Sequence, residues 1–445
     1  MEVCDDSRRG MPLLRLVSRA SPLELPLSGR GAPAGFNFNS QRRDMTSSLD
    51  MRTRDDAMGQ DTPSPSHDTL PPPSNAREPF PWHLGICDAH CHPTDAMASM
   101  ASLATMRAAV LAVMATRSQD QHLVAAVAAS HGVQEGARQP SRRCRVVPSF
   151  GWHPWFSHQL YDDAAAEATY KPPGHGADED AVQGAKKAHY EAVLAPAPDD
   201  DDFIAALPTP VPLSSFTAAT RARLQAHPCA LVGEIGLDKA FRLPRTWDSP
   251  DAASRDDALT PGGREGRLLS PHRVRMPHQR AVLQAQLRLA GAHGRPVSVH
   301  GVQAHGVLYD AVSACWEGSE RHVPSRREKR IPYPPRICLH SFSGGVEMLK
   351  QWMQPSVPAK VFVSLSTAVN LGTDAGRARF ADVVRAVPDA RILVESDLHV
   401  AGADMDAALE DMYRRVCEAK GWGLDEGVAR IGRNFAEFVF GRPRR

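Results

Sequence analysis

The sequence predicts an α/β fold, a TIM (β/α)8 barrel that carries long polar loop insertions and a disordered N-terminal tail. Three observations support this prediction. The chain contains eight short apolar runs, most of them rich in β-branched residues, and segments with helical spacing lie between them. Eight parallel strands are the number that a closed α/β barrel requires. Six of the eight runs end in histidines or carboxylates, as strands do when they open onto one catalytic face.

The eight runs are continuous in their apolar character, as buried parallel strands are. In chain order they lie at 86–92, 109–116, 145–151, 230–237, 296–300, 337–342, 360–366 and 391–397. A helix is expected at 279–293, where apolar residues recur at a spacing of three and four. These residues are Val282, Leu283, Leu287, Leu289 and Ala290.

The polar segments define the domain organisation. Residues 1–80 are rich in Pro, Ser, Arg and Asp and are expected to form a disordered tail. Stretches of similar composition at about 158–205, 241–276 and 317–335 interrupt the barrel as insertions. Loops of a scaffold tolerate such insertions. The barrel is therefore expected to span residues 84–442.

Composition excludes several classes of protein. An apolar fraction of 42% and a charged fraction of 23% are typical of a globular chain. The 52 basic and 51 acidic residues give a net charge of +1, so no global field attracts DNA or anionic lipid. Phosphate binding must therefore be local. The basic clusters at 142–145 and 326–330 are interpreted as solvated loops.

The eight cysteines are scattered and form no CxxC pair, which favours a reducing compartment. The chain has no apolar run of about 18 residues and no secretory signal at its N-terminus. We therefore expect an intracellular protein, cytoplasmic or nuclear, without membrane contact. No surface stripe suggests self-association, so a monomer is expected.

The ends of the runs carry candidate metal ligands. His90 and His92 are two residues apart on a strand, so their imidazoles point to the same side and can chelate one ion. The alternative is a pair of interior histidines, and the position at the end of a run favours ligands. His300 and His340 end two consecutive runs, and Asp397 closes the last run.

Glu234 lies inside an apolar run and between glycines, in Gly233-Glu234-Ile235-Gly236. An unpaired buried carboxylate is costly, so it needs a cation or a strong hydrogen-bond partner. A buried ion pair is the alternative to a metal. These donors suffice for one or two divalent ions. Two ions would be bridged by one acid and would lie about 3.5 to 4 Å from each other. Histidine-rich sites suit zinc or manganese, whereas magnesium prefers oxygen, and the metal stays open.

Seven short strings, in order, together resemble the TatD-type metal-dependent hydrolases, mostly described as DNases, of the amidohydrolase superfamily. They are D-x-H-x-H at 88–92, G-x-H-P at 151–154, G-E-I-G-L-D at 233–238, P-V-x-V-H at 296–300, H-x-F-S-G at 340–344, E-S-D at 395–397 and R-N-F at 433–435. The segments 233–244 and 299–306 resemble a fungal subgroup named for interaction with Cut9, a TPR subunit of the anaphase-promoting complex. That likeness implies a TPR-type partner.

The resemblance also implies roles for individual residues. His90, His92, Glu234 and Asp397 would hold one ion, and Glu234, His300 and His340 the second. Asp397 would take a proton from the attacking water. His153 looks like the contact to the substrate phosphate, with a cap on the strand end as its alternative.

Three functions follow from this site and its resemblance. The first is a phosphodiesterase acting on DNA or oligonucleotides, with Lys239 and Arg242 as phosphate contacts or, alternatively, as solvated loop charge. The second keeps the metals and hydrolyses a small amide, lactone or phosphoester, because a fold does not fix a reaction. The third is a scaffold whose insertions bind a TPR-type partner.

Overall fold

A computed structural model describes residues 78–133, 144–174, 176–247, 255–316 and 333–441. The chain divides into two units, Met1–Asn75 and Ala76–Arg445, and only the second contains described residues. Most of the expected tail, the basic run at 326–330 and most of the insertion at 317–335 lie outside the described residues.

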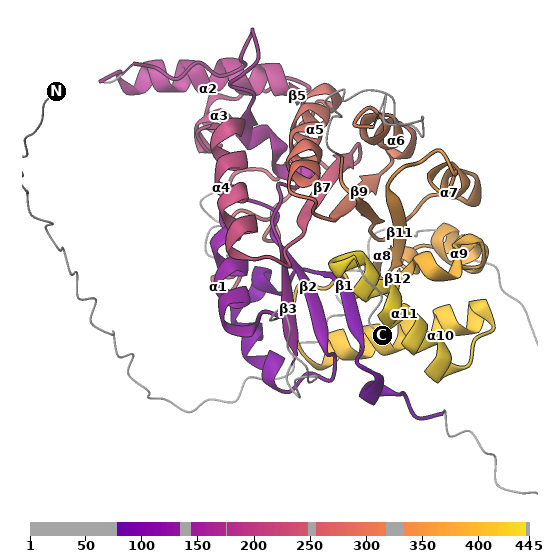
Figure 1. Ribbon diagram of the computed structural model, residues 1–445. Helices are drawn as coiled ribbons and strands as arrows, with labels where there is room; N and C mark the ends of the chain where they lie inside the picture. The colour runs from indigo at the N-terminus through magenta and orange to yellow at the C-terminus, as the bar shows by residue number, and fades with distance from the viewer. Residues whose placement is uncertain (1–77, 134–143, 175, 248–254, 317–332, 442–445) are drawn as a thin grey trace, which may run out of the picture. The chain divides into compact units, whose positions relative to one another are not determined.

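Eight parallel strands form the barrel and correspond to the eight apolar runs (Figure 1). They are β1 (Cys87–Cys91), β2 (Val110–Met114), β3 (Arg145–Ser149), β7 (Val232–Asp238), β9 (Val297–Val302), β10 (Arg336–Leu339), β11 (Lys360–Leu365) and β12 (Ile392–Val394). They pair in two sheets, in the orders β1-β2-β3 and β12-β11-β10-β9-β7.

Backbone hydrogen bonds join the two sheets on both sides. Between β3 and β7, Leu231 donates its N–H to the carbonyl of Pro148 at 3.0 Å. Just beyond β12, Asp397 donates its N–H to the carbonyl of His90 in β1 at 3.0 Å. The strands therefore follow one another in the ring order of a TIM barrel, and the prediction of this fold class is confirmed.

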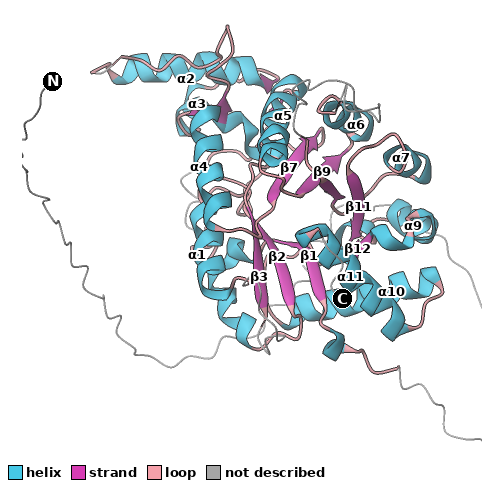
Figure 2. Cartoon of the chain, viewed as in Figure 1, coloured by secondary structure: helices cyan, strands magenta, loops and turns pink. Residues whose placement is uncertain are grey.

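Helices lie outside the strands, as Figure 2 shows. They are α1 (Gln121–His131), α2 (Glu179–Val193), α3 (Asp201–Ala206), α4 (Leu213–Ala226), α5 (Met276–Ala292), α6 (His305–Ser313), α7 (Val346–Trp352), α8 (Thr367–Asn370), α9 (Asp374–Ala386), α10 (Ala403–Lys420) and α11 (Leu424–Phe440), with short 3-10 turns η2 (Trp82–Leu84), η3 (Pro93–Ala104), η4 (Pro154–Gln159) and η6 (Asp389–Arg391). The helix expected at 279–293 is α5. Among the described residues, no helix is long and apolar enough to cross a membrane.

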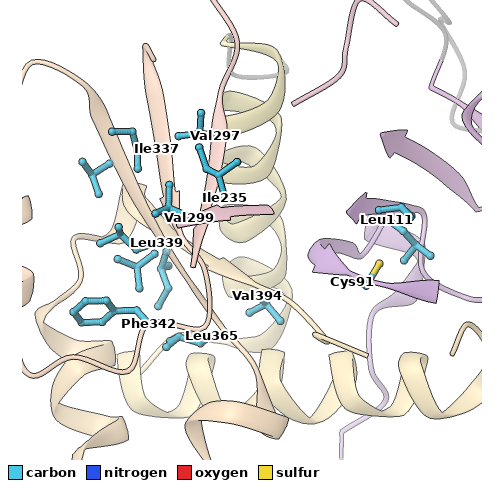
Figure 3. Close-up of a cluster of buried hydrophobic side chains, with 14 of the residues drawn as sticks. Cys91, Leu111, Ile235, Val297, Val299, Ile337, Leu339, Phe342, Leu365 and Val394 are labelled. Atoms are coloured by element: carbon cyan, nitrogen blue, oxygen red, sulfur yellow. The ribbon is translucent and has the colours of Figure 1, made fainter. Parts of the chain in front are cut away.

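Both faces of the strands are buried, which explains their continuous apolar sequences. Alternate residues such as Ile337 and Leu339 belong to the larger cluster (Figure 3). This cluster also contains helix residues such as Leu287 of α5. Cys338 between them belongs to a smaller cluster together with Phe435 and Phe438 of α11. The C-terminal helix thus packs against the second face of the strands.

The stretches at 158–205 and 241–276 contain packed elements, although their polar composition did not indicate any. The minor strand β5 (Leu194–Ala195) pairs with β8 (Arg273–Val274), and so joins the two stretches. A second minor pair, β4 (Leu160–Tyr161) with β6 (Val211–Pro212), lies beside them. A separate apolar cluster around Tyr190 fixes this subregion.

Candidate metal centre

The candidate ligands converge at the carboxyl ends of the strands. β1 carries His90, and His92 follows it directly. β7 and β9 carry Glu234 and His300, and His340 follows β10. All of these residues are at most 7% exposed. Because carboxyl ends of barrel strands open onto one face, residues 250 positions apart in sequence become neighbours.

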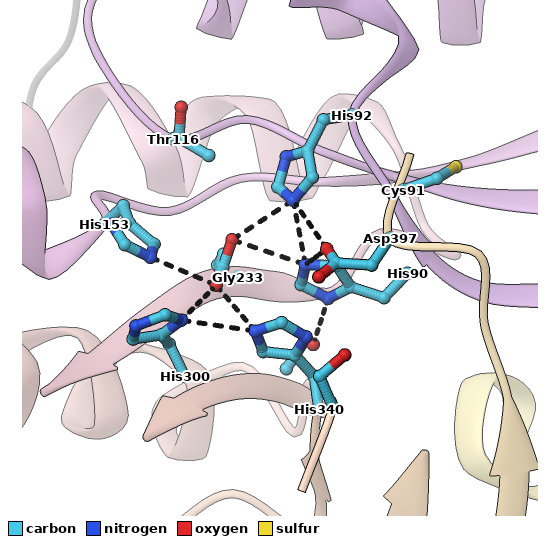
Figure 4. Close-up of polar contacts among 12 residues, drawn as sticks. His90, Cys91, His92, Thr116, His153, Gly233, His300, His340 and Asp397 are labelled. Atoms are coloured by element: carbon cyan, nitrogen blue, oxygen red, sulfur yellow. Dashed lines mark hydrogen bonds and ion pairs between the residues drawn. The ribbon is translucent and has the colours of Figure 1, made fainter. Parts of the chain in front are cut away.

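The two carboxylate oxygens of Glu234 face two different groups of residues. Figure 4 labels the surrounding residues, the histidines and Asp397. Oε2 lies 3.3 Å from Nε2 of His90 and 3.4 Å from Nε2 of His92. Asp397 adds its Oδ1 at 3.5 Å from the same nitrogen of His92.

Oε1 of Glu234 faces the other histidines. It lies 2.9 Å from Nδ1 of His300, 2.8 Å from Nε2 of His340 and 3.1 Å from Nε2 of His153. Glu234 therefore has the placement of a carboxylate that bridges two sites. The groups whose donor atoms lie close enough to hold an ion are His90 with His92 and Glu234, His153 with Glu234 and His300, and His90 with His340 and Glu395.

Three of the histidines are held from behind through their second ring nitrogen. His300 Nε2 lies 3.0 Å from Asp238 Oδ2, and His90 Nδ1 lies 2.7 Å from Ser298 Oγ. His340 Nδ1 lies 3.4 Å from Glu395 Oε1. Partners of this kind fix the ring orientation of metal-binding histidines. Asp238 and Glu395 fall within the strings at 233–238 and 395–397, whereas nothing in the sequence singled out Ser298, which resembles any small residue of a buried strand.

The centre brings carboxylates and histidines close together, so the negative charge of the carboxylates and the positive charge of protonated histidines stabilise each other. Burial raises the pKa of Glu234, but the surrounding histidines outweigh this and hold the pKa well below its usual range. Burial likewise opposes protonation of His92, yet its contact with Asp397 and the charge of Glu234 raise its pKa to about 9. The pKa of His340 is also raised, again against burial, by Glu234 and Glu395. Glu234 is therefore ionised, and its charge needs cations, from protons or from metal.

The structure shows the cap that was the alternative for His153 in the sequence, and it also places the ring beside Glu234. Its Nδ1 accepts the N–H of Trp155 at 3.1 Å and so caps η4, while its Nε2 points to Glu234. Burial lowers its pKa to about 4, although Glu234 acts in the opposite direction. The ring is therefore neutral near pH 7, and it stands at the edge of the centre as a donor.

Two residues of the centre have left-handed backbone conformations, at φ 55° for Asp397 and φ 41° for Ser341. Non-glycine residues adopt such angles at a cost and cluster at functional sites. Ser341 donates a hydrogen bond to Glu395, and Asp397 directs its carboxylate at His92. The strained backbone thus turns both side chains toward the cluster.

A cavity of about 520 Å³ opens over the centre. Besides His92, Glu234 and Asp397, its walls include the aromatic residues Trp155 and Phe241. Lys239 and Arg242, the expected phosphate contacts, are exposed and do not line it. The arginines that line the cavity are instead Arg117 and Arg264. No local pattern distinguished these two from other loop arginines.

The donor set fits divalent metal. Imidazoles and carboxylates meet at hydrogen-bonding distances around a bridging acid, the histidines are oriented from behind, and the site opens into a cavity. These features match the requirements of zinc or manganese sites, which are nitrogen and oxygen donors with outer partners and an open side. Fold and site together define a metal-dependent hydrolase of the α/β-barrel class.

The chain belongs to the TatD-related DNase family, whose sequence model matches residues 87–440. It is 38% identical over 367 residues to the Cut9-interacting protein scn1 of Schizosaccharomyces pombe, an alignment that covers 80% of this chain and 98% of that protein. It is also 28% identical over 307 residues to an uncharacterized deoxyribonuclease of Saccharomyces cerevisiae, covering 66% of this chain and 82% of the relative.

Solved structures give similar matches. A TatD homologue from Escherichia coli has 18% identity and a TM-score of 0.44, and the match covers 80% of this chain and 98% of that one. An uncharacterized amidohydrolase from Saccharomyces cerevisiae has 12% identity and a TM-score of 0.46, covering 81% of this chain and 100% of that one.

Proposed function

We propose that this chain is a metal-dependent phosphodiesterase that hydrolyses DNA or oligonucleotides. The observation that carries the proposal is Glu234, whose two oxygens face two separate sets of donors. Bound divalent ions would lower the pKa of a water and neutralise charge that develops on a phosphoryl oxygen. Two sites bridged by one acid are the arrangement used in many phosphoester hydrolases.

In this proposal the ligand sets are those expected from the sequence. His90, His92, Glu234 and Asp397 would hold one ion, and Glu234, His300 and His340 would hold the other. The distances to Glu234 support both sets. Zinc or manganese suits these donors better than magnesium.

Asp397 accepts the proton of the attacking water. Burial raises its pKa, but the contact with His92 and the nearby histidine charges outweigh this and lower it, so the carboxylate is ionised. It also lines the cavity, where a substrate would lie. A general base must be within hydrogen-bond reach of its proton, and a residue on the wall beside the ligands meets that condition. His153, neutral and beside Glu234, contacts the substrate phosphate.

The test compares native protein with Glu234→Ala. Metal content is measured after purification, and cleavage of labelled single- and double-stranded DNA is measured with magnesium, manganese or zinc added. Removing the bridging acid is expected to abolish metal retention and nearly all turnover. Glu426→Ala, the same change at an exposed position of α11 that does not line the cavity, serves as the matched control and is expected to leave both unchanged. Native protein that binds metal and cuts no DNA would refute the nuclease proposal.

A second candidate is a partner-binding role. The observation in its favour is the 38% identity with a protein named for interaction with Cut9, along 98% of that protein's length. We propose that a TPR-type partner binds the outer surface of the insertions, leaving the cavity free. Binding of purified partner to native chain and to Glu234→Ala tests this, because a scaffold role predicts equal affinity for both.

A further inference from the structure

The cavity over the metal centre has a roof formed by residues 259–265, which lie in the insertion after β7. Arg117, at the end of β2, fixes this roof. Its guanidinium donates to the carbonyls of Thr260 and Pro261, each at 3.0 Å. Thr260 in turn donates its N–H to the carbonyl of Asp95 at 2.8 Å. The roof is thus tied to the barrel and limits what can enter.

The roofed cavity is weakly charged for a site that binds a polyanion. Asp95 at 2.8 Å and Asp120 at 3.2 Å neutralise the buried guanidinium of Arg117. Among the described residues that line the cavity, Arg264 is the only guanidinium without a carboxylate partner. Protein–DNA interfaces are much more positive than this and bury large surfaces. Attraction of a long strand by the cavity's own side chains therefore contributes little, and the positive charge that a phosphate would meet is concentrated at the metal centre.

The cavity also has a wall of aromatic side chains. The rings of Trp155 and Phe241 stack with centroids 4.3 Å apart and planes 9° apart, and both line the cavity. The ring of His153 meets Trp155 edge-on at 4.7 Å. The wall is thus continuous with the residues around Glu234. Planar groups stack on such platforms with a sizeable gain in affinity, whatever their substituents.

The size of the cavity agrees with a compact occupant. Its volume of about 520 Å³ lies within the range of about 300 to 1,000 Å³ that is typical of small-molecule sites. Leu259 in the roof and Val302 at the end of β9 add further apolar surface. A substrate unit that fills this space carries its phosphate toward the histidines and its apolar part toward the wall.

We propose that Phe241, stacked on Trp155 under the roof at 259–265, determines specificity for a phosphoester whose phosphate carries a planar aromatic group. This inference rests on the proposed hydrolase function and names the part of the substrate that the cavity selects. The aromatic group is either the base of a nucleotide at a strand end, which is joined to the phosphate through its sugar, or the ring of a free aryl ester. Both present a planar ring to the wall.

Binding of phenyl phosphate and methyl phosphate to the manganese-loaded protein tests the proposal without turnover. Phenyl phosphate is expected to bind about tenfold more tightly, because stacking supplies the difference. Phe241→Leu keeps an apolar side chain and removes the planar ring, so the preference is expected to disappear. Phe241→Tyr keeps the ring and should retain the preference. Leu268→Ala, at a 66% exposed position of the same insertion, is the control and should behave as native.

Measurements of turnover distinguish a nucleotide at a strand end from a free aryl ester as the substrate. A fall in kcat/KM of Phe241→Leu on both bis(p-nitrophenyl) phosphate and linear oligothymidylate supports a nucleotide at a strand end. A fall on the aryl diester alone supports a free ester. No fall on either substrate overturns the proposal.

Inorganic phosphate distinguishes failure of this inference from failure of the proposed function. If the native protein binds inorganic phosphate but binds phenyl and methyl phosphate equally, the aromatic subsite is wrong and the hydrolase proposal stands. If it binds neither metal nor phosphate, both proposals fail.

Discussion

At the scale of single residues, Asp238 connects a candidate metal ligand with the aromatic wall. Its Oδ2 lies 3.0 Å from Nε2 of His300 and accepts the indole N–H of Trp155 at 2.7 Å. Asp238→Asn places an amide N–H group against the ring nitrogen of His300 and the indole N–H of Trp155, where both now meet a carboxylate oxygen. If the amide instead keeps its oxygen toward these two groups, its N–H group faces the opposite side. Loss of such an outer partner lowers metal affinity about tenfold to a hundredfold. A chelator competition measures this change.

Trp155→Phe is the matched control for Asp238. It removes one donor to the carboxylate and leaves the contact with His300 in place, so metal affinity should stay near that of the native protein. Equal metal affinity in Asp238→Asn and native protein would mean that His300 is oriented by packing alone.

The candidate ligands could be recognised from the sequence, while their outer partners could not be assigned. His90, His300 and His340 each end an apolar run, and a barrel brings such ends together whatever the details of packing. Ser298 does not end an apolar run, and a serine inside a strand usually has a local hydrogen-bond partner, so its role could not be recognised from its position. Its contact with His90 depends on the distance between β1 and β9, which is set by the closure of the ring.

At the scale of elements, Arg117 links the end of β2 to the roof of the cavity. Its side chain is 3% exposed and donates to two carboxylates and two backbone carbonyls. Arg117→Met removes the cation that Asp95 and Asp120 share, although His399 remains beside Asp95 and Thr116 still donates to Asp120. The cost in unfolding free energy should therefore lie near the lower end of the range of about 3 to 5 kcal/mol that is typical when a buried ion pair loses one partner. Urea unfolding measures it. Arg264→Met, on the exposed part of the same roof, should cost no more than about 0.5 kcal/mol. Equal losses in the two variants would show that the roof is not fixed through Arg117.

Three histidines join η4, α2 and α5. His189 Nε2 lies 2.8 Å from the carbonyl of His158, and His278 Nε2 lies 2.9 Å from the carbonyl of Ser157. Burial lowers the pKa of His158 to about 3 and that of His189 to about 4, from an ordinary value of 6.5. Burial also lowers the pKa of His278.

These histidines predict a loss of stability in acid. Between pH 6.5 and about 4 the unfolded chain binds protons that the folded chain does not, so the free energy of unfolding falls as the pH falls. Each such histidine contributes up to about 1.4 kcal/mol per pH unit. His189→Gln should therefore lower this slope by one histidine's share, whereas His122→Gln, at an exposed position, should not. Identical slopes in all three proteins would contradict the assignment.

Helix α2 shows why the insertions were harder to predict than the barrel. Its buried face consists of Lys186, His189, Tyr190 and Val193, which follow helical spacing although two of them are polar. Lys186 is buried because its ammonium group donates to the carbonyl of Ala205 at 2.8 Å. A prediction from hydrophobicity alone places Lys186 and His189 on the solvent-exposed face of the helix. The strands were predictable because burial on both faces leaves room for apolar residues only.

At the scale of the whole molecule, the fold gathers acidic and histidine side chains at one place, where the positive charge of a metal would balance the negative charge of the carboxylates. Glu234 is 3% exposed and lies within hydrogen-bonding or ion-pair distance of His90, His92, His153, His300 and His340. Such a cluster must bind protons when it lacks a cation. Since metal binding replaces those protons, apparent metal affinity should rise with pH up to about 9, where His92 loses its proton.

Metal should consequently stabilise the whole barrel, because its donors come from strands all around the ring. A ligand that binds only the folded state adds about 2.7 kcal/mol at a concentration one hundred times its Kd. Zinc or manganese is therefore expected to raise the Tm of the chelator-treated protein by a few degrees, and the rise should be larger at pH 8 than at pH 6. Glu234→Gln keeps the size of the side chain and removes its charge, so its Tm should not respond to metal. A Tm of native protein that is the same with metal and with chelator would show that protons alone balance the cluster, and the metal proposal would fall with it.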